Sequence, residues 1–167
     1  FSAFMASLMT ADSDDIERIG FEINECRAHG IEVMPPDINK SFVEFSVDKE
    51  SKNIFFGLGA IKNVGKKNLE LIVSERKTEF KSLEDFLERV DLEKKKKKYL
   101  ESLFRVGAFD NLMLRNGYTG DVRRILVDNL EHILKTATSF RKSKNNNQES
   151  LFSGIIEDKL ALNLDKN

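Results

Sequence analysis

The chain has 167 residues, which is long enough to bury a hydrophobic core in one large domain or two small ones. It contains no run of about 18 apolar residues that could cross a bilayer and no signal-peptide pattern. Its single cysteine, Cys26, cannot form an internal disulfide and falls in a helical pattern, so we predict a buried structural thiol. These features predict a cytoplasmic protein with no membrane partner. Because Phe1 already stands in a helix-like segment, we also expect the chain to be part of a longer protein.

The net charge of −1 hides an uneven distribution of charge along the chain. Residues 1–60 contain 5 basic and 11 acidic side chains, residues 61–110 contain 13 and 10, and residues 111–147 contain 7 and 3. An acidic front and a basic middle predict that only the middle contacts a polyanion such as nucleic acid.

The first part of the chain predicts an amphipathic helix and then a small sheet. Residues 14–29 place apolar side chains at helical intervals, with Ser13 or Asp14 as the cap and Gly30 as the stop. Three short segments with strand character follow, at residues 31–34, 42–47 and 54–57. The second and third of these segments are expected to pair as a β-hairpin.

Residues 58–72, LGAIKNVGKKNLELI, predict a helix-hairpin-helix with a tight turn at Asn63-Val64-Gly65, where Gly65 supplies the backbone freedom. Five apolar residues have the spacing that fills the crevice between two such helices: Leu58, Ile61, Val64, Leu69 and Ile72. Unpaired amides and the helix dipole at Lys66 would favour a phosphate. The predicted contacts to a nucleic-acid backbone are Lys62, Asn63, Val64, Gly65, Lys66 and Lys67. The alternative is an αα-corner whose lysines are simply solvated.

A second helical hairpin is predicted after the first. Ser82 opens a helix in capping fashion, although Asp85 stands where a capping box would prefer Glu or Gln. A further helix runs from about Lys95 to Val106 and ends at Gly107. Five lysines lie at the start of that helix, which is the unfavourable end for its dipole: Lys94, Lys95, Lys96, Lys97 and Lys98. Either solvent accepts these charges or a nearby phosphodiester does, and beside the first hairpin we favour DNA.

Residues 119–141 have the pattern of one long closing helix, and the polar segment that follows is predicted to be a linker. In that linker Gln148, Leu151 and Phe152 form a short peptide that suits a surface pocket on another protein, unless the two apolar residues fold back onto the body. The predicted fold class is therefore mainly α (α+β), a helical domain with a small sheet and tandem helix-hairpin-helix. The expected divisions are residues 1–57, 58–141 and 142–167.

Several motifs in this order resemble the alpha subunits of bacterial DNA polymerase III, the C-family replicative DNA polymerases. They are the opening FSAFMASLMTADSDD, the segment IEVMPPDINKS, the glycine-rich entry FFGLGAIKNVG, the second hairpin LESLFRVGAFD, and QESLF, which is similar to the family's motif for the sliding clamp. The resemblance covers residues 1–152. Where the family usually has Asn-Arg-Arg, this chain has Lys96, Lys97 and Lys98, which keep the charge but lose the bidentate geometry of arginine.

By this resemblance the chain is the distal fingers region of a DNA-directed DNA polymerase, which holds duplex template-primer and leads toward the clamp and the remainder of the polymerase chain. The family's nucleotidyl transfer uses Mg²⁺ held by palm carboxylates. No matching aspartate cluster is found here. Asp12, Asp14 and Asp15 are close together but lie at a helix start, where acidic residues are expected for the helix dipole. His29 and His132 are isolated, which argues against a zinc site. We therefore expect no cofactor in this chain and no activity from it alone.

Two other interpretations stay open at the level of sequence. The chain could be a free-standing helix-hairpin-helix module of a DNA-repair protein, or a protein-interaction scaffold whose lysines only confer solubility. Whether Asp37 and Asn39 approach an incoming nucleotide is also open.

Overall fold

The computed structural model describes residues 1–91 and 96–145, with side chains through Ser139. The N-terminal part contains two helices, α1 (Ser2–Ala11) and α2 (Ile16–Ala28), and three two-residue strands, β1 (Val33–Met34), β2 (Ser46–Val47) and β3 (Ile54–Phe55). All the remaining elements are helical, so the predicted fold class, mainly α with a small sheet, is confirmed. No helix in the described residues is long and apolar enough to cross a membrane.

Helix α2 begins at Ile16, two residues after the start of the segment 14–29 that the sequence pattern indicated. Asp15, not Ser13 or Asp14, is the cap, and its carboxylate accepts hydrogen bonds from the amides of Glu17 and Arg18. The helix ends before Gly30, whose φ of 71° matches the predicted stop. Cys26 on this helix is fully buried, as predicted, and burial is the main cause that raises the pKa of its thiol.

The sheet has the order β1-β3-β2. β2 and β3 pair in antiparallel fashion, which confirms the predicted hairpin, whereas the parallel pairing of β1 with β3 was not predicted. The strands are shorter than expected for a physical reason. The backbone carbonyls of Phe42 and Val43 accept hydrogen bonds from Leu58 and Gly59 instead of joining the sheet ladder.

The first hairpin consists of a 3₁₀ turn, η1 (Leu58–Ala60), a loop of residues 61–65, and α3 (Lys66–Glu75). Its first helix is therefore a single tight turn, shorter than predicted. The backbone of residues 43–45 lies so close to it that a Cβ on Gly57 would be 2.6 Å from the Phe45 nitrogen. A Cβ on Gly59 would be 2.9 Å from the Val43 carbonyl oxygen, so glycine is required at both positions.

Five helices complete the described part of the chain: α4 (Leu83–Arg89), α5 (Lys96–Arg105), α6 (Asp110–Arg115), α7 (Val122–Asp128) and α8 (Leu130–Asn145). Ser82 caps α4 through the Asp85 amide, as predicted. At the centre, four phenylalanines form a chain of edge-to-face contacts with ring centroids 5.0–5.1 Å apart: Phe80, Phe86, Phe109 and Phe104.

Three features of this helical part differ from the prediction. Helix α6 was not predicted. The single helix expected at residues 119–141 is divided into α7 and α8 at Asn129, whose backbone and side-chain amides both donate to the Ile125 carbonyl. Finally, α8 continues to Asn145, into the segment predicted to be linker.

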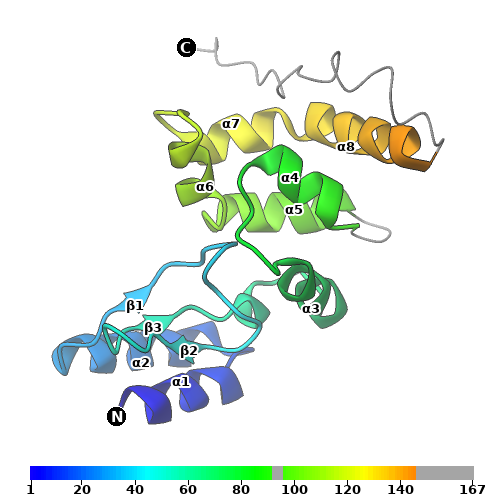
Figure 1. The fold of residues 1–167 in the computed structure, drawn as a ribbon. Coiled ribbons are helices and arrows are strands. Elements are labelled where there is room, and N and C mark those ends of the chain that lie inside the picture. Colours follow the sequence, from blue (N-terminus) through cyan, green and yellow to red (C-terminus); the bar gives the residue numbers. More distant parts are fainter. Residues whose placement is uncertain (92–95, 146–167) are drawn as a thin grey trace.

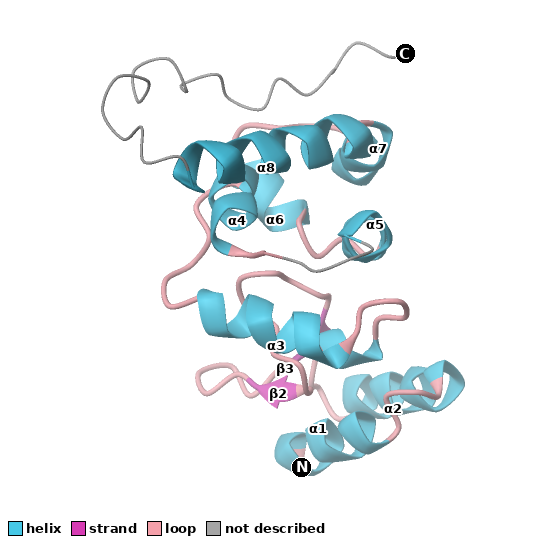
Figure 2. Ribbon diagram, turned by 90° about the vertical axis from the view of Figure 1, so that its right-hand side faces the viewer, coloured by secondary structure: helices cyan, strands magenta, loops and turns pink. Residues whose placement is uncertain are grey.

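Figure 1 shows the elements in two tiers, with α1, α2 and the sheet at one end and α4 to α8 at the other. Helix α3 lies between them, and Figure 2 shows the same order after a quarter turn. The buried residues follow this arrangement. One cluster joins α1, α2 and the sheet, and a larger one joins the first hairpin to α4 through α8. The first hairpin therefore shares its core with the helical tier.

Candidate nucleic-acid interface

The first hairpin has one buried side and one exposed side. The five apolar residues predicted to fill its crevice are all buried: Leu58, Ile61, Val64, Leu69 and Ile72. Gly65, Lys66 and Lys67 are exposed on the opposite side, as are Lys62 and Asn63. The buried side anchors the turn, so its backbone is presented to solvent in a fixed conformation.

The turn reverses at a different residue from the one predicted. Asn63 has a φ of 69°, whereas Gly65 has φ −65° and ψ 145°, an extended conformation open to any residue. Asparagine tolerates the left-handed region, so it makes the reversal here, and the prediction that Gly65 supplies this freedom is wrong. A Cβ on Gly65 would meet only the Asn68 side-chain nitrogen, at 3.9 Å. The missing side chain leaves open space beside the start of α3.

The start of α3 lacks a capping side chain. The caps of α2, α4 and α7 are Asp15, Ser82 and Asp121, and each accepts hydrogen bonds from helix amides. At α3 the cap is Gly65, which has no side chain, and the first turn contains no acidic residue. Within the described part of the chain, the amides of Gly65 and Lys66 donate no hydrogen bond. The dipole and these amides together make a site suited to an anion.

The side chain of Lys66 at this site makes only a weak ion pair. Lys66 Nζ lies 3.8 Å from Glu70 Oε1, one turn along α3, and both side chains are mostly exposed. An ion pair of this kind contributes little, because water screens both charges. Lys66 can therefore leave Glu70 for a phosphate at small cost.

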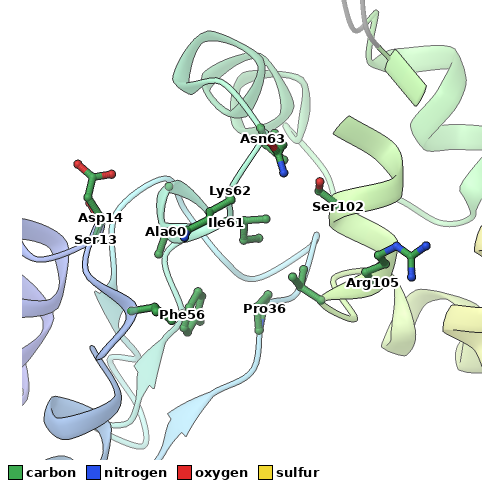
Figure 3. A pocket seen from close by; sticks show the side chains of 14 residues that line it. Ser13, Asp14, Pro36, Phe56, Ala60, Ile61, Lys62, Asn63, Ser102 and Arg105 are labelled. Atoms are coloured by element: carbon green, nitrogen blue, oxygen red, sulfur yellow. The ribbon is translucent and has the colours of Figure 1, made fainter. Parts of the chain in front are cut away.

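A pocket of about 700 Å³ is lined by residues of both the first hairpin and α5. Figure 3 shows Lys62 and Asn63 on one side of it, and Ser102 and Arg105 on the opposite side. The guanidinium of Arg105 is turned away from the hairpin turn in this view and is hydrogen-bonded to Glu101 at 2.7 Å. Neither Ser102 nor Arg105 was singled out from the sequence. The signal was present, since Lys98, Ser102 and Arg105 have the i, i+4, i+7 spacing of one helix face.

The lysine run is only partly available. Lys94 and Lys95 fall at residues 92–95, outside the described residues. Lys96 pairs with Asp91 at 3.3 Å, and Lys97 pairs with Glu131 of α8. The hydrogen bond to Glu131 raises the pKa of Lys97. Lys98 is exposed, and in the part of α5 that the structure describes it makes no ion pair.

The helical hairpin that follows the first one at a glycine turn is formed by α5, the turn at Gly107 and α6, not by the predicted pair α4 and α5; this second hairpin has a closed end. Asp110 places a carboxylate in the first turn of α6 and pairs with Arg123 of α7 at 2.8 Å. The same Arg123 covers the turn, because a Cβ on Gly107 would be 2.3 Å from its Nη2. An anion has no open approach there, so the two hairpins are not equivalent.

The predicted clamp-binding peptide and the acidic residues near the N-terminus lie away from the first hairpin in the sequence. The residues of the clamp-type peptide, Gln148, Leu151 and Phe152, lie outside the described residues. In residues 1–91 and 96–145, no group of three or more His, Cys, Asp or Glu side chains could hold a metal ion. Asp12, Asp14 and Asp15 do not converge on one point. Asp15 caps α2, and Asp12 pairs with Arg18 at 3.1 Å.

The amino-acid sequence matches a known motif family and several known proteins. A profile described as a helix-hairpin-helix motif matches residues 30–117. The chain is 41% identical, over 96% of its length, to DNA polymerase III subunit alpha of Helicobacter pylori strain J99, of which it covers 14%. The subunits of Borreliella burgdorferi and Escherichia coli K12 are 36% and 35% identical over 91% and 93% of the chain, which covers 13% of each. These matches confirm the resemblance read from the motifs. The chain spans about one seventh of the length of these relatives.

Proposed function

This chain belongs to the helix-hairpin-helix family, and from that premise we propose that it binds duplex DNA through backbone phosphates. The observation that carries the proposal is the open start of α3. Gly65 and Lys66 are exposed, their amides donate no hydrogen bond within the described part of the chain, and Gly65 leaves room for close approach. Phosphate contacts of this kind fix position and carry no sequence information.

Lysines extend the contact on both sides of the amide site. Lys62, Lys66 and Lys67 add charge at the hairpin, and Lys98 continues the track on α5 beside Ser102. The hydroxyl of Ser102 is a further donor for a phosphate oxygen. Lys96 and Lys97 contribute less, because each already pairs with an acid of the chain.

The direct test is the salt dependence of duplex binding by the 167-residue chain and its variant Lys66→Glu/Lys67→Glu. Each phosphate neutralised contributes about 0.9 to the slope of log affinity against log salt. We expect the variant to lose affinity and to have a slope shallower by about 1 to 2. The control Lys49→Glu/Lys81→Glu makes the same change in net charge at two exposed lysines outside the hairpin. If the variant and the wild type share one affinity and one slope, the proposal fails.

The larger context of this binding follows from the relatives. Several are named DNA polymerase III subunit alpha, and we propose that this chain is a DNA-holding segment of such a polymerase, acting in DNA replication. In that setting it would grip template-primer duplex behind the active site. Nucleotidyl transfer and its Mg²⁺ would belong to other parts of the longer protein. The described residues offer no cluster that fits the metal, and we derive no catalytic step from them.

A second binding function is proposed for the C-terminal peptide on the resemblance of QESLF to a clamp-binding motif. Gln148 would supply an amide, and Leu151 with Phe152 a two-residue apolar anchor for a pocket on the sliding clamp. We expect a peptide of residues 146–154 to bind the clamp with a Kd of about 1 to 100 μM, as suits a small anchor. We expect Leu151→Ala/Phe152→Ala to abolish binding, with Glu149→Ala as a control that retains it. Equal binding by the double variant would exclude this function.

A further inference from the structure

The segment of residues 37–43 lies in the connection between β1 and β2, and three of its polar residues are buried. Asp37, Asn39 and Ser41 are 8%, 7% and 0% exposed. Buried polar side chains are tolerated only when their hydrogen bonds are made, so each must have a partner within the fold. The partners show what the segment does.

The side chain of Asn39 makes two hydrogen bonds to the backbone of Phe80, 41 residues away. Its side-chain Nδ2 donates to the Phe80 carbonyl at 3.0 Å, and its Oδ1 accepts from the Phe80 amide at 2.8 Å. This pair of bonds fastens the segment to the connection between α3 and α4.

Asp37 and Ile38 fasten the same segment to the second hairpin. Asp37 Oδ2 accepts from Asn111 of α6 at 2.8 Å, while its Oδ1 accepts from the Asn39 amide at 2.7 Å. The amide of Ile38 donates to the carbonyl of Ala108, in the turn between α5 and α6, at 2.8 Å. The end of α5 is thereby tied to the segment.

The first hairpin is fastened at both of its helices. Arg76, at the end of α3, donates through Nη1 to the carbonyls of Ile38 at 2.8 Å and Ser41 at 2.7 Å. At the other helix, the amides of Leu58 and Gly59 donate to the carbonyls of Phe42 and Val43, both at 2.8 Å. One segment of seven residues therefore contacts η1, the end of α3 and the turn that follows α5.

We infer that residues 37–43 form a positioning clasp, which holds the first hairpin and α5 in the one relative orientation that lets both contact a single duplex. The inference rests on the proposed function. Two weak phosphate-binding surfaces bind one duplex more tightly than either alone only when the fold holds them at the matching distance. The entropy of ordering the two surfaces is then lost on folding and not again on binding. Asp37 and Asn39 are in this account positioning residues of DNA binding, and they do not contact the incoming nucleotide.

The test uses Asn39→Ala in the 167-residue chain. Removal of the amide leaves both polar groups of Phe80 buried and unpaired, so Tm is expected to fall by about 3 to 10 °C. At 10 °C, with the fold verified by circular dichroism, we expect duplex affinity to fall about tenfold and the salt slope to be shallower by about 1, since one phosphate contact is no longer held in register. The control is Asn53→Ala, which removes a 3.0 Å bond to the Glu32 amide within the N-terminal tier and should lower Tm without changing the slope.

The outcomes separate the alternatives. If folded Asn39→Ala binds duplex with the affinity and slope of the wild type, the clasp is only structural and the inference is overturned. If the wild type itself does not bind, it is the proposed function that fails. If Asn39→Ala does not fold at 10 °C, Asn111→Ala gives the answer, because it removes only the bond to Asp37 and should cause the same changes to a smaller degree.

Discussion

At the scale of single residues, Asn63 and Gly65 have different roles in the turn of the first hairpin. The left-handed conformation lies at Asn63, while Gly65 adopts an ordinary extended conformation. A glycine in such a position is not needed for the backbone, so its value lies in the side chain that it lacks. The space beside the α3 amides is the result, and it is the feature on which the proposed DNA binding depends.

The sequence could locate this turn but not assign its residues. Glycine is the usual occupant of the left-handed region, and a sequence containing both Asn63 and Gly65 does not say which one takes it. The choice is made by packing. Val64 lies between them and is buried against the core, which fixes the direction in which the chain must leave the turn.

A buried carboxylate at the other end of the molecule predicts a dependence of stability on pH. Glu22 on α2 is 8% exposed, and burial is the main cause that raises its pKa, with the neighbouring Asp12 adding to it. Because the pKa is higher in the folded protein than in the unfolded one, the folded state binds more protons between the two values. Stability from the protonated form is present at low pH and is lost as pH rises through the folded pKa.

We therefore expect Glu22→Gln to be more stable than the wild type at pH 7 and nearly equal to it near pH 4.3, the ordinary value for glutamate. Urea denaturation at the two pH values measures the difference. Glu17→Gln on the exposed side of the same helix is the control and should show no such gain. A Glu22→Gln protein that is less stable than the wild type at pH 7 would falsify the assignment of an unfavourable buried charge.

At the scale of elements, the two hairpins use their glycines in opposite ways. Gly65 has an ordinary φ and open space, whereas Gly107 has a φ of 82° and is covered by Arg123. The second turn is a packing junction between α5, α6 and α7. The first is open to solvent, so the tandem arrangement holds one open turn and one closed turn.

Because Arg123 covers Gly107, alanine at this position should destabilise the protein more than alanine at an uncovered glycine with a similar φ. Gly107→Ala combines backbone strain with a clash against Arg123, and we expect it to lower the free energy of unfolding by about 2 to 4 kcal/mol. Gly117→Ala has a similar φ of 86° but no atom near the new Cβ, so it should cost only about 1 to 2 kcal/mol. Denaturant titration of both variants measures the two free energies of unfolding. Equal losses of free energy would show that a clash with Arg123 does not add to the cost at Gly107.

Elements with strong local signals could be predicted, and those that depend on tertiary contacts could not. The cap at Ser82 and the end of α5 at Gly107 carry their own signals, and both were found. Helix α6 has only six residues, and its cap, Phe109, makes no side-chain hydrogen bond, so nothing local marks its start. The division at Asn129 was missed because the apolar pattern continues across it.

At the scale of the whole molecule, the proposed DNA binding depends on how the fold arranges the charged side chains. The sequence shows where basic residues are concentrated, but pairs such as Lys97 with Glu131 join residues 34 positions apart and become visible only in the fold. The same holds for Ser102 and Arg105, which the fold brings to the pocket beside Lys62. The motif order led to the right family, while the residues that share one surface had to come from the structure.

The central claim is that the uncapped start of α3 binds a phosphate, and Gly65→Asp tests it most directly. A carboxylate at this position would cap the helix as Asp15 and Asp121 do for α2 and α7, and it would occupy the space meant for the phosphate. We expect the variant to be more stable than the wild type by about 1 kcal/mol and to lose at least tenfold in duplex affinity, with a shallower salt slope. Asn24→Asp, an equal change of charge on exposed α2, should leave binding unchanged. A Gly65→Asp protein that is stabilised but binds duplex as the wild type does would contradict the claim.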